Sequence, residues 1–315
     1  MAARAGVVVV GSFNLDHVWR CASLPGSGAT LAGEYASGPG GKGFNQAVAA
    51  ARAGAPATFV CALGDDTGGA LARTLAAADG IELLAVASTQ RTGTAGIFVD
   101  AGGRNCIVIG AGANADLDPA HVQSHAARLA NASVVLAQLE SPGDSIALAL
   151  AIAREGGATT LLNPAPANAA TTPALLGLAD VLVPNETEFA ALLARHCGIT
   201  LAPDSVAGAD EATLHSHCRQ LLPEGTVVVT LGAAGCFVSH PEAARRGDAL
   251  AHYRMPAEPV TPVDTTGAGD AFNGALAASL ATSQRAFAEH LAFAGHYAAL
   301  STLARGAALS MPRLK

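Results

Sequence analysis

The chain has 315 residues, of which 50% are hydrophobic, 14% are charged and only 4% are aromatic. Its net charge of −7 argues against a nucleic-acid partner and against binding to an acidic membrane surface. A chain of this length buries most of the surface that its unfolded state exposes, so it needs no disulfide or metal to fold. These properties favour an enzyme that acts on small molecules.

Short β-branched runs alternate with alanine-rich stretches along most of the chain. The expected strands span residues 7–10, 58–62, 134–137, 159–163, 181–184, 227–230 and 257–263. The expected helices span residues 45–53, 69–78, 144–155, 186–194, 211–221 and 271–280. Buried strands that are each followed by a helix predict a parallel sheet with helices on both faces.

Two segments interrupt this alternation, residues 12–40 and 88–110. Both are rich in Gly and Thr and show strand-like alternation without a helix between the strands, and DAGG at residues 100–103 is typical of a hairpin turn. We predict that they pair into a small antiparallel sheet that stands off the α/β body. Its apolar face needs a cover, which either a ligand cleft or a second subunit can supply.

The cysteines and the N-terminus indicate a reducing compartment. The six cysteines are scattered without a CxxC pair, as expected of small buried side chains in the cytosol. His215, His217 and Cys218 stand close together, but on a helix they would spread over more than half of its circumference, which disfavours a metal site. The run MAARAGVVVV is too short for a signal-peptide core, and we predict a cytoplasmic protein.

Residues 36–47 read ASGPGGKGFNQA and are called the glycine loop below. The spacing G-x-G-x-x-G, which begins at Gly38, matches the fingerprint of dinucleotide-binding proteins, and Asp65 and Asp66 follow at about the expected distance. That fingerprint belongs directly after the first buried strand, whereas this loop follows a half-polar stretch. A dinucleotide site, and with it an NAD-linked dehydrogenase, is therefore disfavoured.

The glycine loop also resembles a P-loop only in part. The pattern G-x-x-x-x-G-K-[ST] requires a glycine where the chain has Ala36, and a hydroxyl residue where it has another glycine. A glycine-dense loop instead exposes backbone amides to a ligand, and the helix behind it presents its N-terminus. Lys42 and Asn45, with Asn14 and Asp16 from the preceding segment, add groups that bind hydroxyls. The alternative is a tight turn whose glycines serve only the packing of a helix on a sheet.

A second glycine cluster, DTTGAGDAFNGA, spans residues 264–275 and leads into a helix. A GAG turn at the start of a helix directs free backbone N–H groups and the positive end of the helix dipole at an anion. Asp270 falls in the first helical turn, where a carboxylate commonly acts as a cap. Beside an anion-binding turn, it can instead accept the proton of a hydroxyl group that attacks a γ-phosphoryl group.

These clusters belong to a longer series of motifs. The series is GSFNLD, GGKGFNQAVAAARAGA, LGDD, QLE, NPAPA, PNETE, TLGAAG and DTTGAGDAFNGA, beginning at residues 11, 40, 63, 138, 163, 184, 230 and 264. In sequence and order it resembles the ribokinase-like sugar kinase family over nearly the whole chain. The resemblance implies one kinase domain over residues 1–315, built as a three-layer, Rossmann-like α/β/α sandwich. It further implies a small β-sheet lid formed by about residues 12–40 and 88–110.

The resemblance also implies a role for single residues. A pentose would lie between the lid and the body, held by Asn14, Asp16, Gly41, Lys42, Asn45, Ala95, Ile97, Glu140 and Asp270. Asp270 would be the catalytic base, and the anion hole would be formed by Gly267, Ala268 and Gly269. The nucleotide side would be formed by Asn185, Thr230, Gly232, Gly235 and Gly269.

Two cations follow from the same resemblance. Glu188 would organise Mg²⁺ through water. A K⁺ ion would lie beside the anion hole, with oxygen ligands from Asp264, Thr266, Ser301, Ala304, Gly306 and Ser310, several of them backbone carbonyls. The family commonly has Arg or Lys near residue 304, where this chain reads LARG, and backbone ligands tolerate such a change of side chain.

Taken together, the residues and the resemblance predict an ATP-dependent kinase that phosphorylates the 5-hydroxyl of D-ribose, as a homodimer through the lid. One alternative is a kinase of another furanose, such as deoxyribose, a keto-sugar or a nucleoside, whose base Phe13 and Trp19 could contact. Another is a sugar-binding regulator without turnover, although such a protein has no need of Asp270, Glu188 and the GAG turn together.

Overall fold

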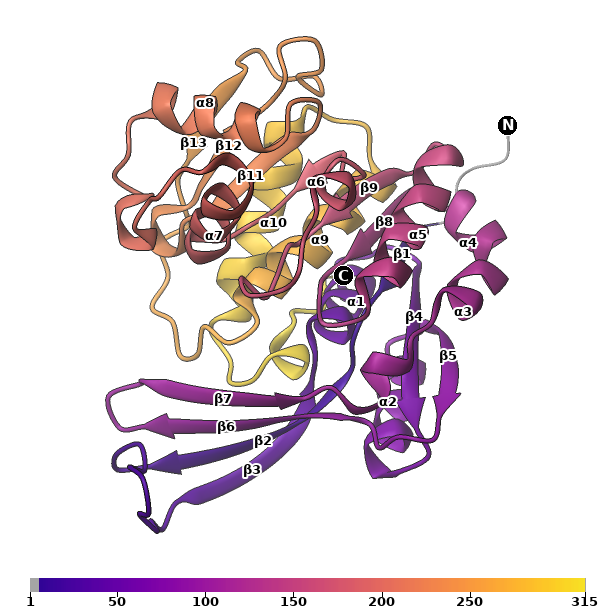
Figure 1. Cartoon of the computed structure of the whole chain (residues 1–315), viewed down its shortest axis with the longest axis vertical. Helices are drawn as coiled ribbons and strands as arrows, with labels where there is room; N and C mark the ends of the chain where they lie inside the picture. Colours follow the sequence, from indigo (N-terminus) through magenta and orange to yellow (C-terminus); the bar gives the residue numbers. More distant parts are fainter. Residues whose placement is uncertain (1–5, 315) are drawn as a thin grey trace.

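The computed structural model describes residues 6–314. Its centre is a sheet in the order β13-β12-β11-β10-β9-β8-β1-β4-β5 (Figure 1). The strands are β1 (Val7–Val10), β4 (Ala57–Gly64), β5 (Glu82–Ser88), β8 (Val134–Ala137), β9 (Thr159–Leu162), β10 (Val181–Leu182), β11 (Thr226–Thr230), β12 (Cys236–Ser239) and β13 (His252–Met255). Neighbours from β11 to β5 are parallel, and β12 and β13 extend the sheet in antiparallel fashion.

Helices cover both faces of this sheet, as predicted. One face packs against α1 (Lys42–Arg52), α2 (Thr67–Ala78), α9 (Ala268–Thr282) and α10 (Phe287–Ser301). The other packs against α3 (Pro119–Ser124), α4 (Ala126–Ala130), α5 (Gly143–Glu155), α6 (Pro173–Leu176), α7 (Glu186–Cys197) and α8 (Glu211–Leu221). Alternate valines of β1 belong to the two cores, which explains why its sequence shows no polar alternation.

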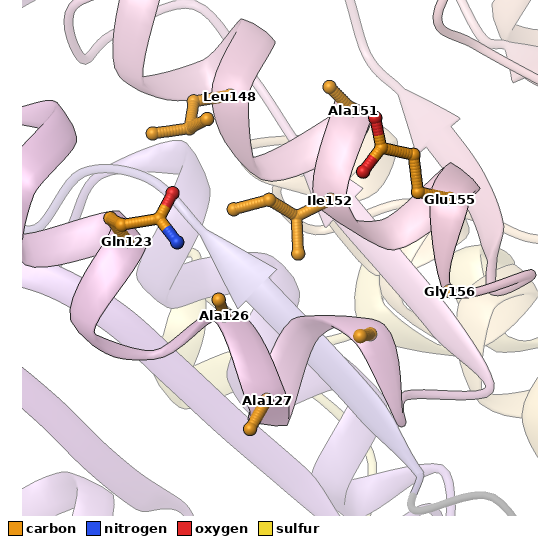
Figure 2. A pocket seen from close by; sticks show the side chains of 9 residues that line it. Gln123, Ala126, Ala127, Leu148, Ala151, Ile152, Glu155 and Gly156 are labelled. Carbon is orange, nitrogen blue, oxygen red and sulfur yellow. The ribbon is translucent and has the colours of Figure 1, made fainter.

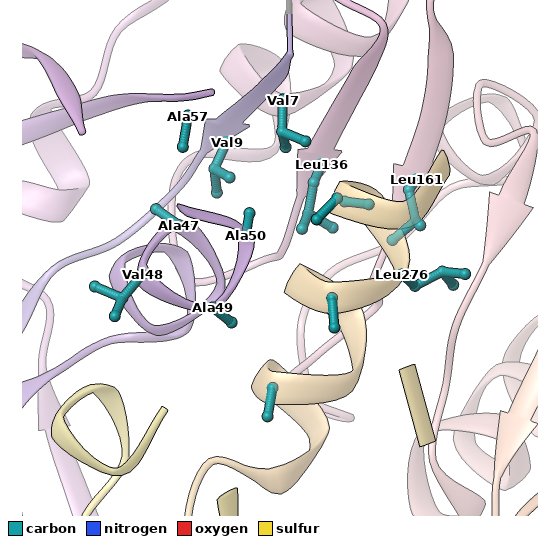
Figure 3. Close-up of a cluster of buried hydrophobic side chains, with 14 of the residues drawn as sticks. Val7, Val9, Ala47, Val48, Ala49, Ala50, Ala57, Leu136, Leu161 and Leu276 are labelled. Carbon is teal, nitrogen blue, oxygen red and sulfur yellow. The ribbon is translucent and has the colours of Figure 1, made fainter. Parts of the chain in front are cut away.

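Small residues let α1 and α9 approach closely beneath the sheet. Figure 3 shows Val7 and Val9 of β1 facing the alanines of α1, while Leu276 of α9 lies near Leu161 of β9. A Cβ atom on Gly274 of α9 would lie 2.5 Å from the Cβ of Ala49 in α1. The alanine-rich composition therefore brings the N-terminal turns of two helices together at one end of the sheet.

A second sheet, called the lid sheet below, stands off the body (Figure 1). Its order is β3-β2-β6-β7, with β2 (Asn14–Cys21), β3 (Glu34–Gly40), β6 (Gly93–Asp100) and β7 (Asn105–Gly110). The hairpins β2–β3 and β6–β7 are antiparallel as predicted, but β2 and β6 pair in parallel, so the prediction of an antiparallel sheet was wrong for this pair. β2 follows β1 in the chain, and β6 follows β5. Because β1 and β5 run in the same direction in the main sheet, the chain enters β2 and β6 from the same edge of that sheet.

The sequence prediction was also wrong for residues 257–263, which form no strand. Pro256, Pro259 and Pro262 remove backbone donors from this stretch, and β13 ends just before it at Met255. Helix α1 begins at Lys42, three residues earlier than predicted, so the last part of the glycine loop is helical. Four short 3₁₀ turns complete the described elements: η1 (Gly112–Asp116), η2 (Pro203–Ser205), η3 (Gly232–Ala234) and η4 (Ala308–Ser310).

Within residues 6–314, no helix combines the length and the apolar character needed to cross a membrane. His215, His217 and Cys218 lie on α8, as predicted for that stretch. His215 Nδ1 lies 2.8 Å from Ser239 Oγ, and Cys218 is fully buried, so both side chains are engaged in packing α8 against β12.

Candidate active site

Three glycines of the glycine loop stand where neighbouring atoms leave no room for a side chain. Gly41 directly precedes α1 and has a φ of 88°, a conformation that L side chains rarely adopt. A Cβ atom on Gly43 would lie 2.5 Å from Ser12 N, and one on Gly40 would lie 2.1 Å from Asp16 Oδ2. The packing alternative is thus partly right, because these glycines bring the N-terminus of α1 against the start of the lid sheet. The candidate site forms at this junction.

Glu140 fixes the first turn of α1. Its Oε2 accepts hydrogen bonds from Ser12 Oγ at 2.6 Å and from the backbone N–H of Lys42 at 3.0 Å. The first N–H groups of a helix lack partners within the helix, and the helix dipole favours a negative charge at this end. The carboxylate therefore holds the glycine loop against the segment that follows β8.

Asp270 lies in the first turn of α9, behind Gly267, whose φ is 78°. Its Oδ2 accepts a hydrogen bond from Asn45 Nδ2 at 2.8 Å, and its Oδ1 accepts one from Gln46 Nε2 at 2.9 Å. The side chain is buried, yet a Cβ atom on Gly269 would meet nothing within 4 Å. The structure thus brings together the carboxylate, the open GAG turn and the glycine loop, as predicted from two motifs that lie far apart in sequence.

Asn14 of the lid sheet and Asn45 of α1 present polar groups at the candidate site. Asn114 Nδ2 donates to Asn14 Oδ1 at 2.8 Å and to Phe13 O at 3.0 Å, which fixes the orientation of the Asn14 amide. Asn45 Oδ1 is buried and has no hydrogen-bond partner among the described residues. An unsatisfied buried acceptor costs about 1–3 kcal/mol, so this oxygen is suited to a ligand hydroxyl that donates to it.

Buried carboxyl groups surround the ammonium group of Lys42. Burial, with the nearby charges of Glu140 and Asp270, raises the pKa of Asp16 to about 7. Burial also raises the pKa of Asp270, against the opposing effects of Lys42 and the two amide donors. Burial alone would lower the pKa of Lys42, but the surrounding carboxylates, Asp270 first, raise it. Lys42 therefore stays charged and compensates part of the negative charge in the site.

The residues predicted for the nucleotide side lie at the ends of β10 and β11. Asn185 caps α7, since its Oδ1 accepts from Glu188 N at 2.8 Å while Glu188 Oε2 accepts from Asn185 N at 2.9 Å. Thr230 N donates to Pro184 O at 2.9 Å and so joins the two strand ends. Burial raises the pKa of Glu188.

Past Thr230 the chain turns through η3. Gly232 has a φ of 52°, and a Cβ atom on it would meet nothing within 4 Å. Gly235 has a φ of 90°, and a Cβ atom on it would lie only 1.9 Å from Met255 O. Gly235 therefore serves the packing of this turn on β13, whereas Gly232 leaves space open beside the strand ends.

The residues predicted to hold K⁺ lie on two loops that meet. Asp264 Oδ1 accepts from Thr266 N at 2.9 Å, and its Oδ2 accepts from Gly306 N at 3.1 Å. Burial raises the pKa of Asp264, but these hydrogen bonds outweigh it and hold the pKa below its ordinary value. A Cβ atom on Gly267 would lie 2.9 Å from the Cβ of Ala307, so both loops adjoin the GAG turn. The remaining predicted ligands lie on the same C-terminal segment: Ser301 ends α10, Ala304 lies between it and Gly306, and Ser310 ends η4.

A cavity of about 740 Å³ lies between the lid sheet and the loops that carry residues 262–266 and 305–309. Asp16 and Ile97 line it from the lid sheet. Ala95 pairs with Asp16 in register, so both side chains lie on this face of the sheet. Of the predicted sugar residues, only Asp16 and Ile97 line this cavity, which extends from them to the loops of the predicted cation site; Lys42, Asn45, Glu140 and Asp270 lie outside its lining.

The two aromatic residues considered for a nucleoside base do not line this cavity. Phe13 is fully buried in the body against Phe44. Trp19 lies on the other face of the lid sheet, with ring centroids 5.3 Å from Tyr35 and 5.2 Å from Phe98. The geometry thus gives no support to a nucleoside substrate.

Of the acidic residues considered with the dinucleotide fingerprint, Asp66 caps α2 by accepting from Gly69 N at 2.9 Å.

A second hollow, of about 450 Å³, lies between α4 and α5 (Figure 2). It is lined mainly by apolar side chains such as Leu148 and Ile152, with Gln123 and Glu155 at its rim. It lies on the opposite side of the main sheet from α1 and α9, and its single ionisable group provides no acid–base pair. The cavity beside the glycine loop is therefore the candidate site.

A family model for pfkB family carbohydrate kinases matches residues 4–314. The chain belongs to this family. It is 36% identical to the ribokinase of Haemophilus influenzae, over 98% of this chain and 96% of the relative. It is equally similar, at 36%, to a bifunctional ribokinase/ribose-5-phosphate isomerase A of Fructilactobacillus sanfranciscensis, of which it spans 54%. The structure of Arabidopsis thaliana ribokinase complexed with ribose and ATP aligns with a TM-score of 0.82 and 29% identity, over 98% of this chain and 96% of that one.

Membership of the pfkB family makes the protein an ATP-dependent carbohydrate kinase. Several buried polar residues of the candidate site were not predicted from the sequence, namely Ser12, Gln46, Asn114, Gln138 and Asn163. Four of them fall within the motifs GSFNLD, GGKGFNQA, QLE and NPAPA, so the signal was their presence in those stretches. Asn114 lies in no such motif, and only the fold brings it beside Asn14.

Proposed function

We propose that this pfkB family kinase transfers the γ-phosphoryl group of ATP to the 5-hydroxyl group of D-ribose. The observation that carries the proposal is the buried carboxylate of Asp270, placed by two amide donors between the glycine loop and the GAG turn. The Arabidopsis relative, whose structure holds ribose and ATP, supports this choice of substrates. Relatives named ribokinase from bacteria and from the mouse support it as well.

In this proposal Asp270 is the general base. It takes the proton from the sugar hydroxyl as that oxygen attacks the γ-phosphorus atom, and ADP departs on the opposite side. The backbone N–H groups of Gly267, Ala268 and Gly269, at the positive end of α9, stabilise the charge on the transferring phosphoryl oxygens. Closure of the lid sheet excludes water, which would otherwise compete with the sugar as acceptor.

In this proposal the sugar lies at the junction of the lid sheet and α1, where the hydroxyl-binding side chains meet. Its hydroxyl groups bind the polar side chains and backbone of Asn14, Asp16, Gly41, Lys42, Asn45 and Glu140, while Ala95 and Ile97 pack over it. The unpartnered Asn45 Oδ1 supports this placement, because a sugar hydroxyl satisfies it. So does the density of carboxyl and amide groups, which suits a free polyol better than an apolar base.

ATP lies on the side of Asn185, Thr230, Gly232, Gly235 and Gly269, at the ends of the parallel strands. Among residues 6–314, no group of three or more His, Cys, Asp or Glu side chains is arranged to hold a metal ion. Mg²⁺ does not require one, because it commonly keeps several waters and binds one carboxylate and the substrate phosphates. Glu188 fits this role, since only its Oε2 is used in capping α7. Bound Mg²⁺ would neutralise phosphate charge.

We further propose that K⁺ binds the loops of Asp264, Thr266, Ser301, Ala304, Gly306 and Ser310. The ionised Asp264 and the contact of both loops with Gly267 fit a cation that stabilises the anion hole.

The prediction of one domain with an inserted lid stays part of this proposal. A cytoplasmic location is supported by six free cysteines, one of them exposed, since thiols persist in a reducing compartment.

The outer face of the lid sheet, away from the cavity, supports the proposed homodimer. It carries Trp19, Phe98 and Val108, of which Val108 is 66% exposed. Tyr35, which is 55% exposed, pairs with Trp19 in register but lies on the edge strand β3 and also borders the cavity. An exposed apolar face that the body of the protein does not cover is typical of a protein–protein contact. A second copy of the chain, placed face to face, covers it.

The experiment that tests the function is ADP release from Mg-ATP in the presence of D-ribose, 2-deoxyribose, fructose, fructose 6-phosphate or adenosine. Each compound is assayed in potassium buffer and in sodium-only buffer. We expect the highest kcat/KM with ribose and a higher rate in potassium. A higher kcat/KM with any other compound would overturn the substrate, and equal rates in the two buffers would overturn the cation site.

A further inference from the structure

Three buried amide side chains behind Asp270 form a chain of hydrogen bonds whose direction is fixed. Asn163 Nδ2 donates to the backbone carbonyl of Val183 at 2.9 Å. A carbonyl oxygen only accepts, so Asn163 must present its nitrogen there and its Oδ1 toward the other side. Gln46 Nε2 donates to this Oδ1 at 3.1 Å.

The same logic fixes Gln46 and its second neighbour. With its nitrogen toward Asn163, Gln46 Nε2 also donates to Asp270 Oδ1 at 2.9 Å. Gln46 Oε1 then faces Gln138 and accepts from Gln138 Nε2 at 2.6 Å. Gln46 and Gln138 are both fully buried, so water does not replace these partners. A flipped Gln46 would set an oxygen against the carboxylate and lose three hydrogen bonds at once.

We propose that Gln46 is a positioning residue for Asp270, held in one orientation by Asn163 and Gln138. It aims Oδ1 of the carboxylate and keeps the carboxylate ionised, so that the base is ready when the sugar hydroxyl arrives. The inference rests on the proposed role of Asp270 as the base. Asn45, by contrast, donates to the other carboxylate oxygen from the side on which its own Oδ1 awaits a ligand.

The charges around Asp270 explain why an amide donor is needed there. Burial raises its pKa, and Glu140 raises it further, while Lys42 of α1 and the amides of Gln46 and Asn45 lower it. Asp16 of the lid sheet and Glu188 of α7 also interact with this carboxylate, and both bring negative charge. Lys42 is therefore shared among several carboxylates, whereas the hydrogen bond from Gln46 acts on Asp270 alone.

Gln46→Met removes the donor and keeps a side chain of similar size. We expect kcat with ribose to fall about 10- to 100-fold, the loss of one hydrogen bond to a charged group, with the ribose KM changed little. Without this donor the pKa of Asp270 rises. The acid limb of the kcat profile, where the base becomes protonated, is therefore expected to move up by about one pH unit. Gln46→Glu, which adds a carboxyl group, moves it further.

Gln138→Met leaves Gln46 in place but frees it to rotate. We therefore expect the acid limb of the kcat profile to move up by less than in Gln46→Met. Ser145→Ala serves as the matched control. Ser145 is equally buried, donates to Leu117 O at 2.7 Å and lies on α5, so its loss affects stability without reaching the site. If Gln46→Met fails to fold, Gln138→Met and Gln46→Glu decide the question by the same profile.

The positioning role would be overturned if every variant that folds had a kcat within about twofold of that of Ser145→Ala and an acid limb at the same pH. Asp270→Ala, assayed in parallel, separates this outcome from failure of the proposed base. If Asp270→Ala is inactive while the Gln46 variants are normal, the base stands and the positioning role falls. If Asp270→Ala retains turnover, the assignment of the base falls, and the positioning role falls with it.

Discussion

At the scale of single residues, the carboxylate of Asp270 is subject to opposing effects. Burial disfavours its charged form, and charge–dipole and charge–charge contacts with Asn45, Gln46 and Lys42 favour it. A base in this state is dehydrated yet ionised, which strengthens its interaction with an incoming hydroxyl proton. The anion-binding turn lies one residue away in the same helix, so base and anion hole move as one unit.

Asp270→Ala tests this residue directly. We expect kcat to fall by about 10³-fold or more, with the dissociation constant for ribose changed only a few-fold, since the other hydroxyl-binding groups remain. Calorimetric titration with ribose and steady-state kinetics measure the two quantities. Asp144→Ala is the matched control, because Asp144 also lies in the first turn of a helix, α5, where its Oδ1 accepts a hydrogen bond from Ser145 N at 2.9 Å. Near-normal kcat in Asp270→Ala would show that another group is the base.

The raised pKa of Asp16 implies that this side chain lowers the stability of the folded protein at high pH, although it is proposed to bind the sugar. Its pKa is about 7 in the folded protein, against 3.8 ordinarily, so the folded state binds more protons between these values. The contribution of Asp16 to the free energy of unfolding therefore decreases as pH rises from about 4 to about 7. Asp16→Asn is expected to raise Tm at pH 8, to leave Tm nearly unchanged at pH 4, and to raise the ribose KM. Scanning calorimetry at both pH values measures the effect, and an equal gain at both would contradict it.

The motifs named Asp270, Lys42 and Asn45 because their side chains have an evident chemistry at the start of a helix. Gln46 and Gln138 stood in the same motifs without an assigned role. Their partners lie 224 and 92 residues away in sequence, and only the crossing of α1 with α9 and β8 brings them together. A buried amide has no chemistry of its own, and its role depends entirely on what it faces.

At the scale of elements, the approach of α1 and α9 sets the geometry of the site. Gly274 stands at their crossing, where a Cβ atom would lie 2.5 Å from both Ala49 Cβ and Gln46 O. Any side chain there pushes apart the helices that carry Asp270 and its two amide donors. Packing and catalysis are thus linked at one glycine.

Gly274→Ala is therefore expected to lower the free energy of unfolding by about 1–3 kcal/mol and to lower kcat. Gly295→Ala in α10 is the matched control, because a Cβ atom there meets nothing within 4 Å. Removing a helical glycine without a clash should raise the free energy of unfolding by about 0.5–1 kcal/mol. Urea denaturation and steady-state kinetics measure both variants. The same change in stability for the two variants would contradict this view of the crossing.

The sequence predicted the parallel strands well, because buried β-branched runs between helices have few other interpretations. It predicted the two hairpins of the lid sheet from turn residues, but the parallel pairing of β2 with β6 depends on how β1 and β5 are placed in the main sheet. Prolines removed the strand expected at 257–263. Helix α1 began early because Glu140, nearly a hundred residues away, satisfies the N–H of Lys42.

At the scale of the whole molecule, the lid sheet has two faces with different tasks. The inner face carries Asp16 and Ile97 into the cavity, and the outer face carries the stack of Trp19, Tyr35 and Phe98. The strict alternation of side chains along β2 produces both faces from one strand. The same sheet can therefore cover the sugar and contact a second copy.

Val108→Glu places a charge on the outer face without touching the cavity. We expect sedimentation velocity to show monomers for this variant and dimers for the unchanged protein, because a buried unpaired charge opposes association. Leu250→Glu is the control, since Leu250 is 61% exposed and lies beside β13, away from the lid sheet. A dimer that survives Val108→Glu would rule out this face as the contact.

The most direct test of the whole account is to identify the product formed from D-ribose and Mg-ATP by ³¹P and ¹H NMR. We predict one phosphomonoester, attached to C5, in amounts equal to the ADP released. In parallel, 5-deoxyribose, which lacks the acceptor hydroxyl, should bind without ADP release. Phosphate on another carbon, or ADP release with 5-deoxyribose equal to that with ribose, would contradict the proposed placement of the sugar against Asp270.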